Sequence, residues 1–78
     1  MEMYHVNITT KQGNQVYVST IFDRHARFWN YETKIFGLTI DENYVEHMGE
    51  ELYVDHYMTG EDALIGHKKA CEYAINNL

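Results

Sequence analysis

Apolar and polar residues alternate along the first part of the chain. In YHVNITT, Tyr4, Val6 and Ile8 fall on one face of an extended segment, and polar residues occupy the positions between them. This period of two is typical of a half-buried β-strand. KQGN, which contains Gly13, follows as a turn, and QVYVSTIF is rich in β-branched and aromatic residues. Residues 1–22 therefore predict a β-hairpin.

Two further alternating segments predict two more strands. Residues 27–36, RFWNYETKIF, place Trp29, Tyr31, Thr33 and Ile35 on one face, and GLTI either extends this strand or bends it at Gly37. In ELYVDHYM we expect Leu52, Val54, His56 and Met58 on the inner face and Tyr53, Asp55 and Tyr57 on the outer one. DRHA, residues 23–26, is an irregular connection or a single helical turn. YVEHMGEE stays open between a short helix, a loop and a strand end.

Residues 59–78 have the period of a helix. Thr59 is expected to cap its N-terminus together with Asp62, since a hydroxyl there accepts from a backbone N–H of the first turn. At about 100° per residue, one apolar arc holds Ala63, Leu64, Ala70, Cys71, Ala74, Ile75 and Leu78, whereas Lys69, Glu72, Tyr73 and Asn76 face away. His67 lies inside the apolar arc. We expect it to be a core residue that is hydrogen-bonded to a polar group on the sheet.

Together the elements predict a single small α+β domain over residues 1–78. Its sheet is a three- to four-stranded antiparallel sheet with one C-terminal helix packed across one face, in the order β-β-β-β-α. The uncovered face would carry Tyr17, Tyr53 and Tyr57. One cysteine suits a reducing compartment. No apolar run reaches the ~18 residues of a membrane span, and no signal-peptide pattern opens the chain, so the sequence predicts a cytoplasmic protein that avoids membranes.

The negative charge is concentrated in one part of the chain. The net charge is −6, yet residues 41–62 contain no Lys or Arg. Their carboxylates are Asp41, Glu42, Glu46, Glu50, Glu51, Asp55, Glu61 and Asp62. Such a block is either a solvated face that keeps a small protein soluble or a negative surface that binds a basic partner.

Two segments resemble a family of small tailed-phage and prophage proteins. That family has a YETMVF-like strand and a Y-x-T-x-E-E-A-x-x-G-H segment that opens a C-terminal helix. The matching residues here are Tyr31, Glu32, Thr33, Ile35 and Phe36, and then Tyr57, Thr59, Asp62, Ala63, Gly66 and His67. Lys34 replaces an apolar residue of the family and His56 replaces an Arg, so a role of that Arg is not carried over. The resemblance implies a phage or prophage origin and supplies no biochemical activity.

Three residue groups could carry chemistry. His67 and Cys71 are four residues apart on one helical face, and an inward-pointing His56 would complete three zinc ligands. A buried thiol and a hydrogen-bonded imidazole are the structural alternative. Glu32 and His67 could form a general-base dyad or a hydrogen-bonded brace between strand and helix. Arg24, His25 and Arg27 are mixed with aromatic residues, as in single-stranded nucleic-acid binders. Two arginines are few for phosphate contacts and the chain is acidic, so nucleic acid is not the expected partner.

The sequence therefore predicts a phage accessory protein that is not an enzyme and that needs no cofactor. It would bind a protein partner with a basic surface, in one version inhibiting a host defence protein that binds nucleic acid. The expected contact residues are Glu46, Glu50, Glu51, Tyr53, Asp55 and Tyr57. The alternative function is a small metal-binding or nucleic-acid-associated accessory protein that uses His56, His67 and Cys71. A homodimer with a structural role is the third interpretation.

Overall fold

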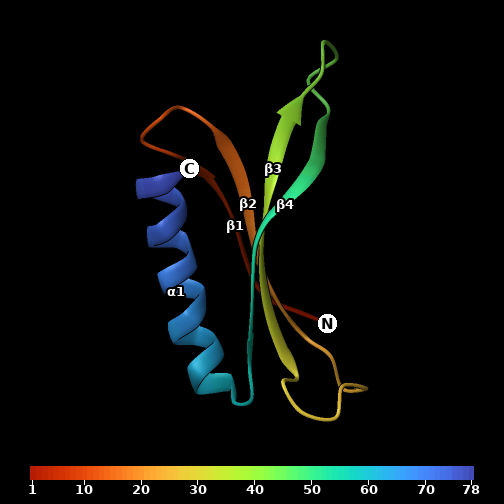
Figure 1. Ribbon diagram of the computed structural model, residues 1–78. Helices are drawn as coiled ribbons and strands as arrows, with labels where there is room; N and C mark the ends of the chain where they lie inside the picture. The colour runs from red at the N-terminus through yellow and green to blue at the C-terminus, as the bar shows by residue number, and fades with distance from the viewer.

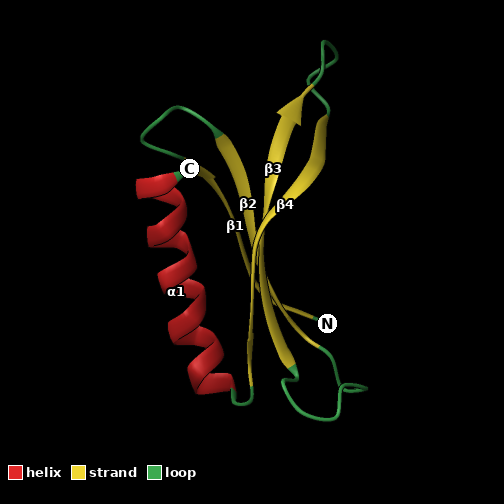
Figure 2. Cartoon of the chain, viewed as in Figure 1, coloured by secondary structure: helices red, strands yellow, loops and turns green.

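The computed structural model describes residues 1–78 and confirms the β-β-β-β-α order. The four strands form one antiparallel sheet in their chain order, and a single helix lies along one face of it (Figures 1 and 2). The elements are β1 (Glu2–Thr9), β2 (Gln15–Phe22), β3 (Tyr31–Ile40), β4 (Glu46–Tyr57) and α1 (Gly60–Asn77). The strands β1 and β4 are the two edges of the sheet.

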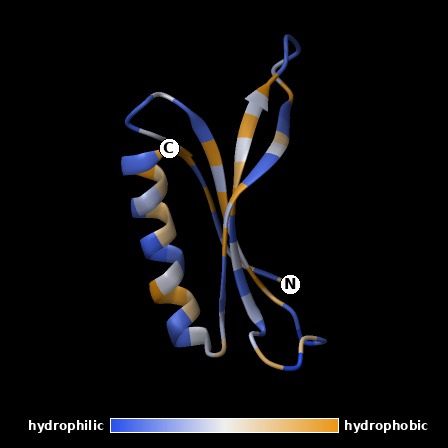
Figure 3. Cartoon of the chain, in the orientation of Figure 1, coloured by the Kyte–Doolittle hydropathy of each residue, from blue (hydrophilic) through white to orange (hydrophobic).

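The core lies between the two central strands and the helix. Val16, Val18 and Ile35 on the sheet meet Ala70 and Ala74 of α1, and all five are buried. Hydrophobic and hydrophilic positions alternate along the strands, which is how one face supplies this core (Figure 3). The buried positions of α1 are Ala63, Gly66, His67, Ala70 and Ala74. Because four of these five are Ala or Gly, the helix backbone can lie close to the sheet.

Both ends of α1 are held by polar contacts. Thr59 caps its N-terminus as predicted, because the Thr59 hydroxyl accepts from the backbone N–H of Asp62 at 3.1 Å. At the other end, the N–H of Lys11 donates to the carbonyl of Ile75 at 2.9 Å. The amide of Asn14 donates to the carbonyl of Leu78. The turn between β1 and β2 therefore holds the C-terminal end of the helix in place.

The third strand starts later than predicted. Residues 27–30 belong to the β2–β3 loop, because the φ angle of 21° at Trp29 breaks the extended backbone. The loop is closed by its own hydrogen bonds, from the N–H of Asp23 to the carbonyl of Asn30 at 2.7 Å and from the Asn30 amide to the carbonyl of Ala26 at 3.1 Å. Trp29 consequently leaves the core-facing row of β3 and is 56% exposed.

The hairpin of β3 and β4 is longer than predicted. YVEHMGEE is largely strand, since β4 begins at Glu46, and GLTI both extends β3 and bends it. The register of the two strands shifts between Ile35 and Phe36 and again between Phe36 and Leu38. Residues 39–51, which we call the hairpin arm, project past the C-terminal end of α1 (Figure 1). The arm is therefore a two-stranded ribbon without a helix on it.

The two faces of β4 were wrongly assigned over residues 53–57. Tyr53, Asp55 and Tyr57 pair with Ile35, Thr33 and Tyr31, which places them on the face that α1 covers. Val54 and His56 pair with Lys34 and Glu32 on the open face. Leu52 does lie on the helix side, as predicted, where it lines a groove with Val16 and Leu78. The register shift next to it explains how Leu52 and Tyr53 can share one side.

Tyrosine packing explains why the two faces of β4 are opposite to the prediction over residues 53–57. The Tyr57 ring lies directly against Gly66, and the Tyr53 ring stacks on Tyr73 with 5.4 Å between ring centroids. Tyr73 was predicted to face away from the sheet, which is wrong because the Tyr53 ring beside α1 offers it an apolar surface. Only Tyr17 of the three predicted tyrosines lies on the open face, where its hydroxyl donates to Glu2 at 2.7 Å.

Candidate functional site at the edge strand

His67 is a core residue, as predicted. It is 9% exposed, and its Nδ1 lies 2.8 Å from the hydroxyl of Thr20. That hydroxyl is 2.6 Å from the hydroxyl of Thr33, and the imidazole ring lies 5.4 Å from the ring of Tyr4. Burial lowers the pKa of His67, because the charged form loses hydration. The arrangement links α1 to the two central strands through a neutral imidazole.

The structure does not bring the three candidate metal ligands together. His56 lies on the open face, where its Nε2 is 2.8 Å from a carboxylate oxygen of Glu32. Cys71 is half-buried on α1, on the other side of the sheet, and burial raises the pKa of its thiol. No group of three His, Cys, Asp or Glu side chains in the chain is placed to hold a metal ion. The candidate site does not form because His56 lies on the open face and not, as the sequence suggested, on the face toward α1.

The predicted pair of Glu32 and His67 is also absent. Glu32 lies on the open face, so its partners are His56 and the ammonium of Lys34, which is 3.5 Å away. His67 points into the opposite layer and bonds to Thr20 instead. The brace between strand and helix therefore exists, but a threonine hydroxyl provides it.

Charges on the open face are balanced within the face. Lys34 bridges Glu32 and Glu51, with 2.8 Å to Glu51, and this hydrogen bond raises the pKa of Lys34. The Glu2 carboxylate accepts from Ser19 at 2.6 Å and from Tyr17. The Ser19 bond is the main cause that lowers the pKa of Glu2, and the bond to Glu2 raises the pKa of Tyr17 to about 12. This face offers little unpaired charge to a partner.

The basic and aromatic residues of the β2–β3 loop do not form one surface. Arg24 and His25 line a hollow with Met1 and Phe22. Trp29 lies on another side of the loop, beside Asp55 and His56. A carboxylate next to the aromatic ring disfavours a phosphate there, so the structure does not favour the alternative of a nucleic-acid surface.

The hairpin arm combines exposed carboxylates with exposed apolar side chains. Glu46, Glu50 and Glu51 are exposed. Glu46 accepts from the Asn7 amide at 3.2 Å, Glu51 pairs with Lys34, and the Glu50 side chain has no hydrogen bond or ion pair within the chain. The apolar side chains that are more than half exposed on the arm are Ile40, Tyr44, Val45 and Met48. Exposed apolar side chains that are surrounded by polar residues mark protein–protein contact sites.

Asp41 organises the tip of the arm. One oxygen of its carboxylate accepts from the backbone N–H groups of Asn43 and Val45 at 2.8 and 3.0 Å. The other oxygen lies 2.8 Å from Nε2 of His47. The bond to His47 and then the backbone bonds lower the pKa of Asp41. The tip is therefore a defined turn that keeps its negative charge.

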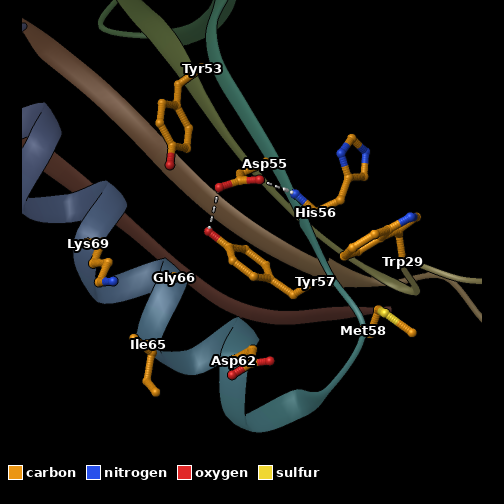
Figure 4. Close-up of a pocket in the computed structure, with 10 residues that line it drawn as sticks. All are labelled: Trp29, Tyr53, Asp55, His56, Tyr57, Met58, Asp62, Ile65, Gly66 and Lys69. Carbon is orange, nitrogen blue, oxygen red and sulfur yellow. Dashed lines mark hydrogen bonds between the residues drawn. The ribbon is translucent and has the colours of Figure 1, made fainter.

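A pocket of about 450 Å³ lies at the other end of β4, between the edge strand and α1 (Figure 4). Asp55 is one of its lining residues. Its carboxylate accepts from the Tyr57 hydroxyl at 3.2 Å and from the backbone N–H of His56 at 2.8 Å. Burial raises the pKa of Tyr57, with contributions from Tyr53 and Asp55, so this phenol stays a donor. The lining residues are Trp29, Tyr53, Asp55, His56, Tyr57, Met58, Asp62, Ile65, Gly66 and Lys69.

The six predicted contact residues thus divide between the two ends of one strand. Glu46, Glu50 and Glu51 lie on the hairpin arm, while Tyr53, Asp55 and Tyr57 line the pocket. Trp29 also lines the pocket, although the sequence placed it either on the core-facing row of the third strand or among the aromatic residues of a nucleic-acid-binding segment. The exposure of the only tryptophan becomes visible once residues 27–30 are known to form a loop.

Comparisons with protein-family models, with curated proteins and with solved structures give no match for this chain. No helix of this chain combines the length and the apolar composition that crossing a membrane requires. The fold and the site define an α+β protein of one helix and four antiparallel strands, with acidic and aromatic residues gathered on an edge strand. Its function is argued from that strand.

Proposed function

We propose that this chain acts by stoichiometric binding to a protein with a basic surface, and that β4 and the hairpin arm make the contact. The observation that carries the proposal is the composition of this edge. Its strand and preceding turn hold six of the carboxylates, with no Lys or Arg among them. They alternate with exposed apolar side chains such as Met48 and Tyr44.

Exposed apolar side chains give a reason for the arm to associate with another protein. Tyr44 is 89% exposed and Met48 is 62% exposed. The arm projects past the end of α1, so the helix does not cover these side chains (Figure 1). Burial of such side chains at an interface is favourable at roughly 25 cal/mol per Å² of apolar surface. The surrounding carboxylates then favour a partner of positive charge and speed its approach.

The partner class that fits this pattern is a protein with a basic groove. A negative surface of this kind can occupy a groove that otherwise binds DNA or RNA, so inhibition of a nucleic-acid-binding host or defence protein is our specific version. In that version the chain is a phage or prophage product that acts in the host cytoplasm. The support is the charge of the arm and the resemblance of the YET and Gly-His segments.

A single charge reversal on the arm tests the proposal. Glu50 is the best position, because Glu51 is tied to Lys34 and its reversal would also disturb the open face. Glu50→Lys is expected to slow association with the captured partner roughly 3- to 10-fold and to reduce the dependence of the rate on salt. The partner is captured from a lysate of the host cell with the tagged wild-type chain, and association is then measured by surface plasmon resonance.

Glu72→Lys is the matched control, since it makes the same charge change on an exposed helix position away from β4. It should leave the association rate within twofold of wild type, roughly the change expected from net charge alone. Circular dichroism of both variants checks that the fold is intact. Equal effects of the two reversals would contradict a contact through the arm.

A further inference from the structure

We propose that the pocket between β4 and α1 is a receptor for one arginine side chain of the partner. The inference rests on the proposed function, because it names the partner group that the helix-side end of β4 recognises. It deepens that function through a separate part of the strand, so the two can be tested independently.

The Asp55 carboxylate is held in a defined orientation. The Tyr57 hydroxyl and the backbone N–H of His56 bind its two oxygens, at 3.2 and 2.8 Å. Each carboxylate oxygen has two acceptor sites, so both can accept a further bond from a ligand. A guanidinium can donate to both oxygens at once, which gives a strong and directional contact. Because Asp55 is already oriented, the contact costs little ordering.

Aromatic rings lie beside this carboxylate. Trp29 borders it on the loop side, while Tyr57 and Tyr53 border it on the strand (Figure 4). The indole of Trp29 is more than half exposed, so a flat cation stacked on it would remove apolar surface from water. Tryptophan is the best aromatic partner for cations, and a guanidinium is flat enough to stack on it.

The charges that line the pocket favour one cation. Asp62, in the first turn of α1, adds a second carboxylate to the lining, on the other side of the Tyr57 ring from Asp55 (Figure 4). Lys69, one and a half to two turns further along the helix, is the only ammonium of the lining and lies on the opposite side from Trp29 (Figure 4). The position of Lys69 thus confines a bound cation to the end of the pocket with Trp29 and Asp55. An arginine suits that end better than a lysine, which cannot stack or form the double contact.

The pocket has room for more than the guanidinium. Its volume is about 450 Å³, and its lining also includes the apolar side chains of Met58 and Ile65, which are 55% and 47% exposed. Met58 and Ile65 lie on opposite sides of the pocket (Figure 4), so two apolar residues, one on each side of the arginine in the partner, would cover them. The geometry therefore indicates an arginine flanked by aliphatic residues in a protein segment, in preference to a free small guanidine.

A short peptide tests the proposal. The probe is a fluorescein-labelled Gly-Leu-Arg-Leu-Gly amide, whose binding is followed by anisotropy, and an unlabelled copy reports through Trp29, the only tryptophan of the chain. We expect the arginine peptide to bind at least about tenfold more tightly than the same peptide with citrulline, which keeps the shape but loses the charge. Trp29 emission should change on addition of the arginine peptide.

Three variants of the full chain separate the contributions. Asp55→Asn should weaken peptide binding at least about tenfold, since it keeps the shape of the side chain and removes its charge. Trp29→Leu should weaken it as well, and this loop substitution keeps the test valid if Asp55→Asn does not fold. Lys69→Gln should tighten binding, because it removes a like charge. An anion-binding pocket would show the opposite effect of Lys69→Gln.

Several outcomes would overturn the inference. These are equal binding of the citrulline peptide, weaker binding by Lys69→Gln, or binding that leaves Trp29 emission unchanged. If free arginine amide bound as tightly as the peptide, the pocket would belong to a small guanidinium ligand and the partner segment would be wrong. If the peptide fails to bind while Glu50→Lys still slows capture of the partner, only this inference is lost. If the peptide binds but Glu50→Lys has no effect, the role of the arm is lost.

Discussion

His67 shows how one polar residue can stabilise a small core. Its ring fills space beside Tyr4 and its Nδ1 meets the Thr20 hydroxyl at 2.8 Å. We expect His67→Ala to lower the free energy of unfolding by about 1–3 kcal/mol, because it leaves a hole and deprives a buried hydroxyl of a partner. Urea denaturation monitored by circular dichroism measures the difference at pH 8. His25→Ala, on an exposed loop, is the control and should change stability by less than about 0.5 kcal/mol.

The same residue gives a pH dependence with a definite sign. Burial lowers the pKa of folded His67 below its ordinary value of 6.5, so the unfolded chain binds the proton more readily. The stabilisation from neutral His67 is therefore complete above pH 6.5 and is lost as the pH falls through the lower folded pKa. The wild type should lose more stability than His67→Ala between pH 8 and pH 5. Equal slopes over that range would show that His67 is not buried in its neutral form.

Helical periodicity was enough to place His67 in the core, but not to identify its partner. Its position among Ala63, Ala70 and Ala74 follows from the turn angle of the helix alone. The partner depends on how α1 lies across the sheet, and Thr20 is 47 residues away in sequence. Glu32 was a reasonable candidate by charge, yet the pleat of β3 turns it to the other face. Contacts between distant elements depend on register, which no local pattern contains.

The seating of α1 on the sheet depends on one glycine. A Cβ at Gly66 would overlap the Tyr57 ring. Alanine normally favours a helix over glycine by up to about 1 kcal/mol, but here we expect overpacking to dominate. Gly66→Ala should lower the free energy of unfolding by about 1–3 kcal/mol, as measured by urea denaturation.

Removal of the ring should reverse that sign. In a Tyr57→Ala background the space is free, so adding Gly66→Ala is expected to stabilise the chain by up to about 1 kcal/mol through helix propensity. The comparison is between the double variant and Tyr57→Ala alone. A loss of stability in both backgrounds would mean that Gly66 is needed for a reason other than the Tyr57 ring.

At the scale of elements, the sequence predicted the number, order and type correctly. Alternation also showed that β4 is a strand. A period of two does not tell which face is buried, however, when both faces hold amphipathic residues. Val54 and Met58 made one face look internal, whereas Tyr53 and Tyr57 bury more surface beside the small residues of α1. The start of β3 was predicted wrongly because Trp29 has a positive φ. Tryptophan is usually extended, so nothing in the sequence marks this break.

The molecule as a whole is elongated, with principal extents of 41 × 25 × 16 Å. Its core is at the helix-covered end of the sheet, and the hairpin arm extends beyond it (Figure 1). A two-stranded ribbon without a packed face is only marginally stable in water. We therefore expect amides of the arm to exchange with solvent by local opening, well before those of β2 residues 16–20, in hydrogen-exchange NMR. Uniform protection of the two regions would show that the arm unfolds only with the core.

At this same scale, the acidic block in the sequence indicated the strand on which our candidate site lies, but not that the site divides between the two ends of that strand. The helix separates a pocket end from a free end, and that separation depends on where α1 stops relative to β4. The number of charges along the chain predicts neither the two ends of β4 nor the place where α1 stops. The pocket also needs Trp29 from a distant loop, so its aromatic wall could only be found in three dimensions.

Asp55 has a second consequence for how this chain coexists with its own copies. An unpaired outer strand tends to recruit foreign strands, and this one has a carboxylate folded back over the outward N–H of His56. The Asp55 carboxylate, which we propose binds an arginine of the partner, thus also hinders edge-to-edge pairing of β4 with strands of other copies. Replacing Asp55 is therefore expected to have two effects: weaker binding of the partner and easier pairing of β4 with strands of other copies.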